Sequence, residues 1–225
     1  MKVLAIIPAA GSGKRLKKNC DKPFIEVNSK PLLFYALNAL ESSPLIDEII
    51  LVVAKKRISK ALNLVRRFRF RKVIKIIRGG KTRSESVSNG LKLLKKSNAD
   101  LVFIHDGVRP FLEKSLIERC IKAAKKFGSS VACVPVKPTI KAERNGFILK
   151  TLERSTLLEA QTPQVFRKDL ILKAYKNKKM LVCSTDDSKL VEKIGHKVRI
   201  VEGSNRNIKV TTPEDLLLAK ALLKR

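Results

Sequence analysis

Short apolar segments alternate with segments of helical periodicity along most of this chain, and that alternation restricts the fold more than any other feature of the sequence. Buried strands are predicted at residues 3–7, 48–54, 73–77, 101–105, 130–136 and 197–201. Helices are predicted at residues 31–42, 58–68, 82–95, 114–127, 170–178, 187–194 and 213–224. Strands that alternate with helices favour a mostly parallel sheet covered by helices on both faces. The sequence therefore predicts an α/β protein with a Rossmann-like, doubly wound sheet.

The alternation stops at about residues 136–158, where prolines and polar residues interrupt it. Apolar and polar residues then alternate on both sides of Asn145-Gly146, which is typical of a β-hairpin with a tight turn. Such a hairpin has little core of its own, so we expect a protruding β-arm that packs on a second subunit. The length of 225 residues otherwise suits one domain, residues 1–225, that carries this arm.

The clearest chemical signal directly follows the first predicted strand. It reads PAAGSGKR over residues 8–15, and Lys22 comes soon after it. Glycines at 11 and 13 allow close backbone approach, so that successive N–H groups can point at phosphate oxygens. The spacing matches neither the Walker loop nor the dinucleotide-binding G-x-G-x-x-G pattern. The segment favours a triphosphate-binding loop, although an ordinary strand-to-helix turn can have this sequence.

A second signal lies where the strand at residues 101–105 ends. Asp106 and Arg109 follow that strand, at the edge of a parallel sheet where ligands bind. A carboxylate there can hold Mg²⁺ beside a triphosphate, and an arginine can bind phosphate. The alternative is that Asp106 only caps the next turn. His105 precedes it, and we interpret this histidine as structural.

Two further segments precede predicted helices. Gly79-Gly80 leads into the helix that begins near Thr82, and helix N-termini bind anions well. Lys209 lies just before the last helix, for which Thr212 is the expected N-cap. Each segment is also compatible with a simple capped helix and a solvated lysine.

The balance of charge narrows the possible partners. Forty-nine Lys and Arg against twenty Asp and Glu give a net charge of +29, which attracts polyanions such as nucleic acid, anionic membranes or phosphorylated small molecules. Residues 66–72 interleave Arg with Phe, as in some nucleic-acid-binding segments. We expect those Phe side chains to pack inward, so nucleic acid is an unlikely partner. Cationic residues spread along the whole chain more often form a solvated surface.

The cysteines and the apolar runs predict a cytoplasmic protein with no membrane segment. Cys20, Cys120, Cys133 and Cys183 form no C-x-x-C pair, so we expect reduced thiols rather than a zinc site or a disulfide framework. No apolar run approaches the ~18 residues of a membrane span.

In this order and spacing, the motifs resemble those of the 2-C-methyl-D-erythritol 4-phosphate cytidylyltransferases of the non-mevalonate isoprenoid pathway. The likeness covers the whole chain and includes residues 135–141, Arg154, 161–166, 185–187 and 202–211. It implies a nucleotidyltransferase that moves CMP from CTP to 2-C-methyl-D-erythritol 4-phosphate, giving 4-diphosphocytidyl-2-C-methyl-D-erythritol and pyrophosphate. It also implies a homodimer formed through the arm.

The resemblance assigns roles to individual residues. It implies catalytic roles for Arg15, Lys22 and Lys209. It implies nucleotide contacts from Pro8, Ala9, Ala10, Gly11, Ser12, Gly13, Gly80, Arg83, Ser86 and Asp106. It implies contacts with the phosphate-bearing acceptor from Asp106, Arg109, Thr139, Arg154, Thr162 and Lys209, with Arg154 and Thr162 acting across the dimer interface. Asp106 would also bind Mg²⁺.

Two positions depart from the usual pattern of that family. Lys81 stands where an acidic residue is common, and Gly107-Val108 replaces a frequent Ala-Ala. The form His-Asp-x-Val-Arg-Pro-Phe also occurs in the ribitol-5-phosphate cytidylyltransferases. Ribitol 5-phosphate is therefore the alternative acceptor.

Overall fold

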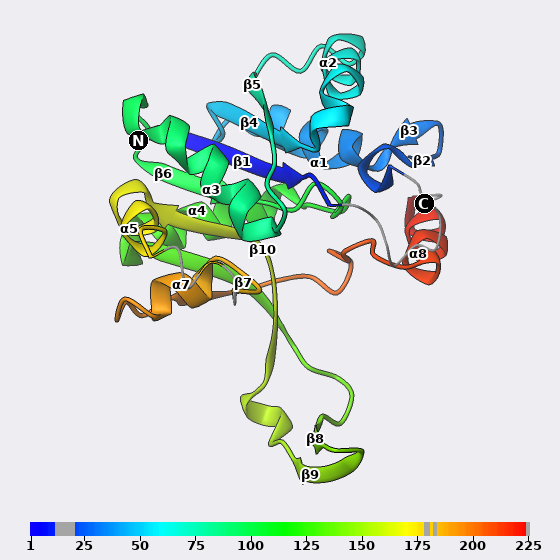
Figure 1. Ribbon diagram of the computed structural model, residues 1–225, viewed down its shortest axis with the longest axis vertical. Helices are drawn as coiled ribbons and strands as arrows, with labels where there is room; N and C mark the ends of the chain where they lie inside the picture. The colour runs from blue at the N-terminus through cyan, green and yellow to red at the C-terminus, as the bar shows by residue number, and fades with distance from the viewer. Residues whose placement is uncertain (12–20, 178–180, 182–183, 224–225) are drawn as a thin grey trace.

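The computed structural model describes residues 1–11, 21–177, 181 and 184–223, apart from the side chain of residue 96. Within them, a central sheet has the strand order β11-β7-β10-β6-β1-β4-β5 (Figure 1). The strands are β1 (Val3–Ala9), β4 (Glu48–Val53), β5 (Val73–Arg78), β6 (Leu101–Ile104), β7 (Ser129–Pro135), β10 (Leu158–Arg167) and β11 (Arg199–Glu202). Strand β1 is parallel to β4 and β6, β4 to β5, and β7 to β11. The predicted α/β fold with a mostly parallel sheet is confirmed.

Helices cover both faces of this sheet. They are α1 (Leu32–Glu41), α2 (Ile58–Arg67), α3 (Arg83–Leu93), α4 (Lys114–Phe127), α5 (Lys168–Ala174), α7 (Ser188–Glu192) and α8 (Pro213–Leu223). Ala5 and Ile7 of β1 belong to the core under α1, α2 and α4, whereas Leu4 and Ile6 face α3, α5 and α7. Because a central strand is buried on both faces, its sequence is one continuous apolar run.

Strand β10 was not predicted, and it is the antiparallel member of the sheet, between β6 and β7. It contains Gln161, Thr162 and Gln164, which are buried although they are polar. These residues interrupt the apolar alternation by which a strand is found, so the sequence pattern does not show β10. The small hairpin of β2 (Glu26–Val27) and β3 (Lys30–Pro31) was also not predicted. In addition, the helix expected at 170–178 begins earlier, at Lys168, and ends at Ala174.

The expected arm is present. Strands β8 (Lys141–Arg144) and β9 (Phe147–Thr151) pair antiparallel, and Asn145 and Gly146 between them have φ of 53° and 84°. Positive φ at both turn residues defines the hairpin turn that Asn-Gly favours. The arm leaves the sheet between β7 and β10 and extends away from the body (Figure 1).

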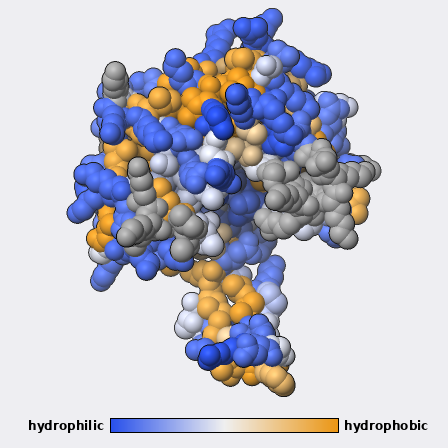
Figure 2. All heavy atoms as spheres, viewed as in Figure 1, coloured by the Kyte–Doolittle hydropathy of each residue, from blue (hydrophilic) through white to orange (hydrophobic). Residues whose placement is uncertain are grey.

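The arm carries apolar side chains that no described part of the chain covers. Phe147 is 77% exposed, Ile148 68% and Leu149 64%. Figure 2 shows hydrophobic residues gathered along the arm, which stands apart from the mixed surface of the body. Exposed apolar patches of this kind mark interaction surfaces.

The basic segment at residues 66–72 packs as expected. The ring of Phe34 in α1 lies 4.5 Å from that of Phe68 and 5.8 Å from that of Phe70, measured between centroids. Both Phe side chains therefore pack against the core, Phe70 buried and Phe68 partly buried.

Within the described residues, no helix has the length and apolar character needed to cross a bilayer. Cys120 and Cys133 are buried free thiols, while Cys20 and Cys183 lie outside the described residues.

Candidate active site

A cavity of about 480 Å³ opens where β1 and β6 end side by side. Its lining residues are Pro8, Ala9, Ala10, Gly11, Lys22, Pro23, Gly80, Lys81, Thr82, Arg83, Ser86, Asp106, Val108, Lys209 and Thr211. The chain runs from β1 outward to β4 and β5 and then returns to β6 on the other side of β1. The cavity therefore lies at a point where strand order reverses, as ligand sites in such sheets do.

One wall of the cavity is the N-terminal end of α3. A Cβ on Gly79 would lie 2.3 Å from the Cβ of Ala10, so only glycine allows the end of β5 to pack against the loop after β1. The Gly80 N–H donates to Ser86 Oγ at 3.1 Å, and Thr82 Oγ1 caps the helix by accepting from the Glu85 N–H at 3.1 Å. These contacts fix the helix end against the cavity.

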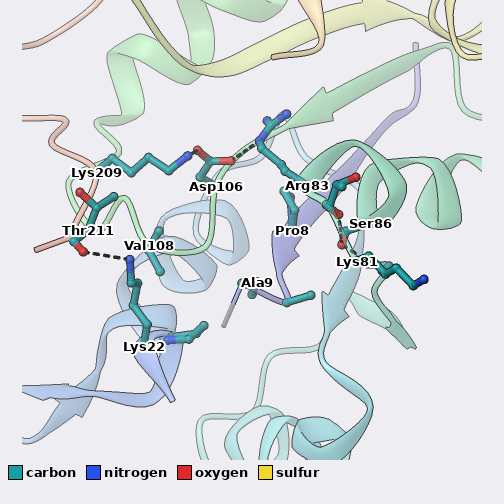
Figure 3. Close-up of a pocket in the computed structure, with 15 residues that line it drawn as sticks. Pro8, Ala9, Lys22, Lys81, Arg83, Ser86, Asp106, Val108, Lys209 and Thr211 are labelled. Atoms are coloured by element: carbon teal, nitrogen blue, oxygen red, sulfur yellow. Dashed lines mark hydrogen bonds and ion pairs between the residues drawn. The ribbon is translucent and has the colours of Figure 1, made fainter. Parts of the chain in front are cut away.

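Asp106 is the centre of charge. Its carboxylate lies 2.8 Å from Arg83 Nε, 2.7 Å from Lys209 Nζ and 3.8 Å from Arg109 Nε. Figure 3 shows Lys209 and Arg83 approaching Asp106 from opposite sides, while Lys81 extends away from them. Three cations from three separate segments thus converge on one buried carboxylate.

The same cations keep Asp106 ionised. Burial alone would raise its pKa, but Arg83, Lys209 and Arg109 together hold the pKa of this carboxyl well below its usual range. An ionised carboxylate so enclosed acts as a fixed counter-charge that orients its partners.

Arg83 is also held by a second carboxylate, that of Asp187. Its Nη2 lies 2.9 Å from Asp187 Oδ2, and Tyr175 donates its hydroxyl to the other oxygen of Asp187. Gln164 Oε1 accepts from the Asp187 N–H at 3.0 Å. Arg83 Nη1 is buried and finds no hydrogen-bond partner among the described residues. This leaves a donor that a bound ligand can satisfy.

His105 and Thr162 hold the backbone of Asp106 in place through a chain of hydrogen bonds. His105 Nε2 lies 3.1 Å from the Arg109 carbonyl oxygen, and its Nδ1 lies 3.1 Å from Thr162 Oγ1. A carbonyl only accepts, so Nε2 carries the proton and Thr162 donates to Nδ1. Thr162 Oγ1 in turn accepts from the Asp106 N–H at 3.1 Å. Burial lowers the pKa of His105 to about 4, so the ring is neutral and structural, in agreement with our interpretation.

Lys22 completes the polar rim. Lys22, buried in the short helix η2 (Lys22–Phe24), donates to the Thr211 carbonyl oxygen at 3.3 Å. Asp215 fixes that segment by accepting from the Thr211 N–H at 2.7 Å and from the Thr212 N–H at 2.9 Å. The predicted N-cap is also present, because Thr212 Oγ1 accepts from the Asp215 N–H at 3.2 Å.

Almost the whole chain matches a known protein family. The family model described as 2-C-methyl-D-erythritol 4-phosphate cytidylyltransferase matches residues 3–225. The chain belongs to that family.

Relatives of the cytidylyltransferase family match along almost their whole length. A protein of that name from Clostridium acetobutylicum is 46% identical over 224 residues, covering 98% of this chain and 97% of the relative. One from Dehalococcoides mccartyi, strain 195, is 46% identical and covers 100% and 97%. These names do not favour the ribitol-5-phosphate alternative.

Solved structures agree with the family assignment. The crystal structure of 4-diphosphocytidyl-2C-methyl-D-erythritol synthase from Anaerococcus prevotii has a TM-score of 0.85 and 34% identity, covering 100% of this chain and 99% of that one. The Thermus thermophilus 2-C-methyl-D-erythritol 4-phosphate cytidylyltransferase has a TM-score of 0.81 and 30% identity, covering 100% of both chains.

Most residues predicted for the nucleotide side of this cytidylyltransferase lie together. The cavity collects Pro8, Ala9, Ala10, Gly11, Lys22, Gly80, Arg83, Ser86, Asp106 and Lys209. Ser12, Gly13 and Arg15 lie outside the described residues. Sequence reasoning missed Asp187 and Tyr175 as anchors of Arg83. The Asp186-Asp187 pair before a predicted helix was the available signal.

The residues predicted for the acceptor are more scattered. Thr162 is buried behind Asp106, and Arg109 donates to the Asn207 carbonyl oxygen at 2.6 Å without lining the main cavity. Thr139 and Arg154 are exposed on the arm, where Arg154 donates to the Lys137 carbonyl oxygen at 3.1 Å. The described part of one chain thus brings neither arm residue to the cavity.

No cluster of three or more His, Cys, Asp or Glu side chains suited to a metal occurs among the described residues. Asp106 is the carboxylate among the cavity-lining residues.

Proposed function

We propose that this cavity is where the protein transfers CMP from CTP to 2-C-methyl-D-erythritol 4-phosphate, with release of pyrophosphate. The observation that carries the proposal is the charge of the lining, in which Lys22, Lys81, Arg83 and Lys209 outnumber Asp106. A triphosphate and a phosphate monoester are both polyanions, so a site that brings them together needs an excess of positive charge.

The chemistry needs no nucleophilic side chain. The acceptor phosphate is ionised at neutral pH, and one of its oxygens attacks the α-phosphorus of CTP. The bond between the α-phosphorus and the bridging oxygen breaks, and that oxygen leaves with pyrophosphate. Positioning and neutralisation of charge therefore supply most of the rate enhancement.

The described residues divide this work. Lys209, held by Asp106 at 2.7 Å, and Lys22, held at the Thr211 carbonyl, stand ready for phosphate oxygens. Arg83 offers its unpartnered Nη1. The backbone at Gly80 and the hydroxyl of Ser86 lie at the end of α3, where we place the cytosine and ribose.

Mg²⁺ is the proposed cofactor, with Asp106 as its protein ligand. Arg83 and Lys209 already occupy the two Asp106 oxygens, at 2.8 Å and 2.7 Å, so a bound ion would have to displace one of them and would be held mainly by substrate phosphates and water. Bound there, Mg²⁺ would neutralise charge on the triphosphate.

The protein is proposed to act as a single-domain homodimer joined through the arm at about residues 136–158. Support comes from the exposed Phe147, Ile148 and Leu149. Thr139 and Arg154 lie on the same arm and would reach the partner's acceptor site. We place the protein in the cytoplasm, in keeping with the free thiols of Cys120 and Cys133.

A paired-substrate assay tests the proposed reaction. Release of pyrophosphate from CTP is measured with Mg²⁺ and either 2-C-methyl-D-erythritol 4-phosphate or ribitol 5-phosphate. We expect turnover with the first acceptor and little with the second. Equal or faster turnover with ribitol 5-phosphate would overturn the assignment of the acceptor.

The same assay tests the phosphate-binding lysines. Lys22→Ala and Lys209→Ala should each lower kcat/KM by about 10²-fold or more with the fold intact by circular dichroism. Lys122→Ala, on the exposed face of α4, is the matched control and should behave as wild type. Near-normal rates for the first two variants would remove them from the site.

A further inference from the structure

Arg57 is a buried arginine that the cavity and the sequence motifs leave unexplained. It ends the short helix η3 (Lys55–Arg57) after β4 and is 3% exposed, whereas its neighbours Lys55 and Lys56 are exposed. A buried guanidinium is costly unless hydrogen bonds and an opposite charge compensate it. The buried guanidinium of Arg57 therefore needs hydrogen-bond partners that offset the cost of its burial.

Its partners come from both sides of the segment between β1 and η2. Arg57 Nε lies 2.6 Å from Asp21 Oδ1, and Arg57 Nη1 donates to the Gly11 carbonyl oxygen at 2.9 Å. Because the guanidinium is a rigid planar fork, one side chain sets the relative position of these two acceptors. A lysine at this position has no fork and cannot fix both.

Each acceptor belongs to the wall of the cavity or adjoins it. Gly11 lines the cavity, and Asp21 immediately precedes the lining residue Lys22. The Asp21 carbonyl accepts from the Phe24 N–H at 2.7 Å, which closes the helical turn that carries Lys22. Arg57 itself does not line the cavity. Among the described residues, its side-chain hydrogen bonds reach the site through Asp21 and Gly11.

We propose that Arg57 is a positioning residue for the triphosphate site: it holds Gly11 and, through Asp21, Lys22 at the spacing that the nucleotide requires. The inference rests on the proposed function for the identity of the nucleotide. The ion pair is permanent at neutral pH, since burial would raise the pKa of Asp21 but the hydrogen bond and charge of Arg57 lower it.

The test compares Arg57→Lys and Arg57→Met with Lys55→Met, a matched control that removes an exposed charge from the same turn. CTP binding is measured by calorimetry without acceptor, and KM for CTP and for the acceptor by steady-state kinetics. All are measured well below each variant's unfolding midpoint. We expect both Arg57 variants to raise the Kd and KM of CTP about tenfold or more, and the KM of the acceptor much less. Lys55→Met should match wild type.

A purely structural role would lower the unfolding midpoint and leave CTP affinity unchanged. Folded Arg57→Met or Arg57→Lys protein that binds CTP like wild type would therefore overturn the inference. Asp21→Asn covers the case in which Arg57 variants fail to fold, because Asp21 is partly exposed. It should weaken CTP binding in the same way, and wild-type affinity would refute the proposal. If all variants fold, the double variant Arg57→Met/Asp21→Asn should lose no more CTP affinity than the weaker-binding single variant. Fully additive losses of CTP affinity would count against the proposal.

A different result would refute the proposed function without refuting the role of Arg57. Wild-type protein that binds CTP but does not use 2-C-methyl-D-erythritol 4-phosphate would refute the reaction while leaving the CTP-binding comparison of Arg57 intact.

Discussion

Individual residues in this site are defined by their neighbours more than by their own chemistry. Asp106 retains its charge because Arg83 and Lys209 hold both of its oxygens. His105, next to it, is neutral at physiological pH because burial lowers its pKa, and its two nitrogens are engaged by Thr162 and the Arg109 carbonyl. The neutral ring thereby holds the threonine hydroxyl that supports the Asp106 amide.

The lowered pKa of His105 predicts a specific loss of stability in acid. An unfolded histidine binds a proton below about pH 6.5, whereas folded His105 stays neutral until about pH 4. Acid therefore favours the unfolded state between those values, by up to about 3 kcal/mol from this group. The free energy of unfolding, measured by denaturant titration from pH 7.5 to 4.5, should fall more steeply for wild type than for His105→Asn.

The remaining histidine provides the control for this effect. His196→Asn is measured alongside, because it removes the other histidine of the chain at a separate place in the fold, where Nε2 lies 3.0 Å from Ser129 Oγ. Identical pH slopes for wild type and His105→Asn would show that His105 does not carry the linkage.

The sequence predicts the cavity-lining residues that lie within motifs, but not the residues from distant parts of the chain that hold them in place. Lys22, Asp106 and Lys209 are predictable because each lies next to a strand end or helix start. Arg83 and Asp187 are 104 residues apart, so their ion pair exists only after folding. Arg109, predicted to contact the acceptor, also donates to the Asn207 carbonyl oxygen, a contact with a distant segment that local pattern does not show.

At the scale of elements, short apolar runs and an Asn-Gly turn were enough to predict most strands and the arm. Strand β10 was not predicted because the residues in its middle are polar and buried, and hydrogen bonds to distant parts of the chain stabilise them. Asn207, for example, donates to the Thr162 carbonyl oxygen at 2.7 Å. A strand satisfied by distant side chains leaves no periodic signature in its own sequence.

The arm predicts complementation between two inactive variants. Arg154→Ala should damage the arm's contribution, and Lys22→Ala the body's. If the arm acts on the partner subunit, co-refolding equal amounts should restore one complete site in each heterodimer, about a quarter of wild-type activity for random pairing. Turnover after co-refolding checks this. Absence of recovery, with heterodimers confirmed by mass spectrometry, would place Arg154 in its own subunit's site or outside the reaction.

At the scale of the whole molecule, the net charge of +29 exceeds what one cavity requires. Basic residues spread along the chain create a positive field that raises the local concentration of anionic substrates, and dissolved salt screens that field. Phe68 and Phe70, which alternate with arginines at residues 66–72, pack against Phe34 and so contribute to the core.

This field predicts a dependence of catalysis on ionic strength. The value of kcat/KM for CTP should fall as KCl rises from about 50 to 500 mM, since the Debye length shrinks several-fold over that range. Sucrose at matched osmolarity should have no comparable effect. A value of kcat/KM that is independent of salt would mean that the surface charge serves some purpose other than substrate capture.

The arm and the active site share a strand, which limits how such a protein can diversify. Strand β10 leaves the arm at Leu158 and carries Thr162 to the Asp106 amide. An extra residue inside β10 would reverse the faces of the side chains beyond it and separate that pair. An extra residue at the Asn145-Gly146 tip would only lengthen the arm. Insertions during evolution are therefore expected to accumulate at the tip, where a lineage can change what the arm contacts without altering the cavity.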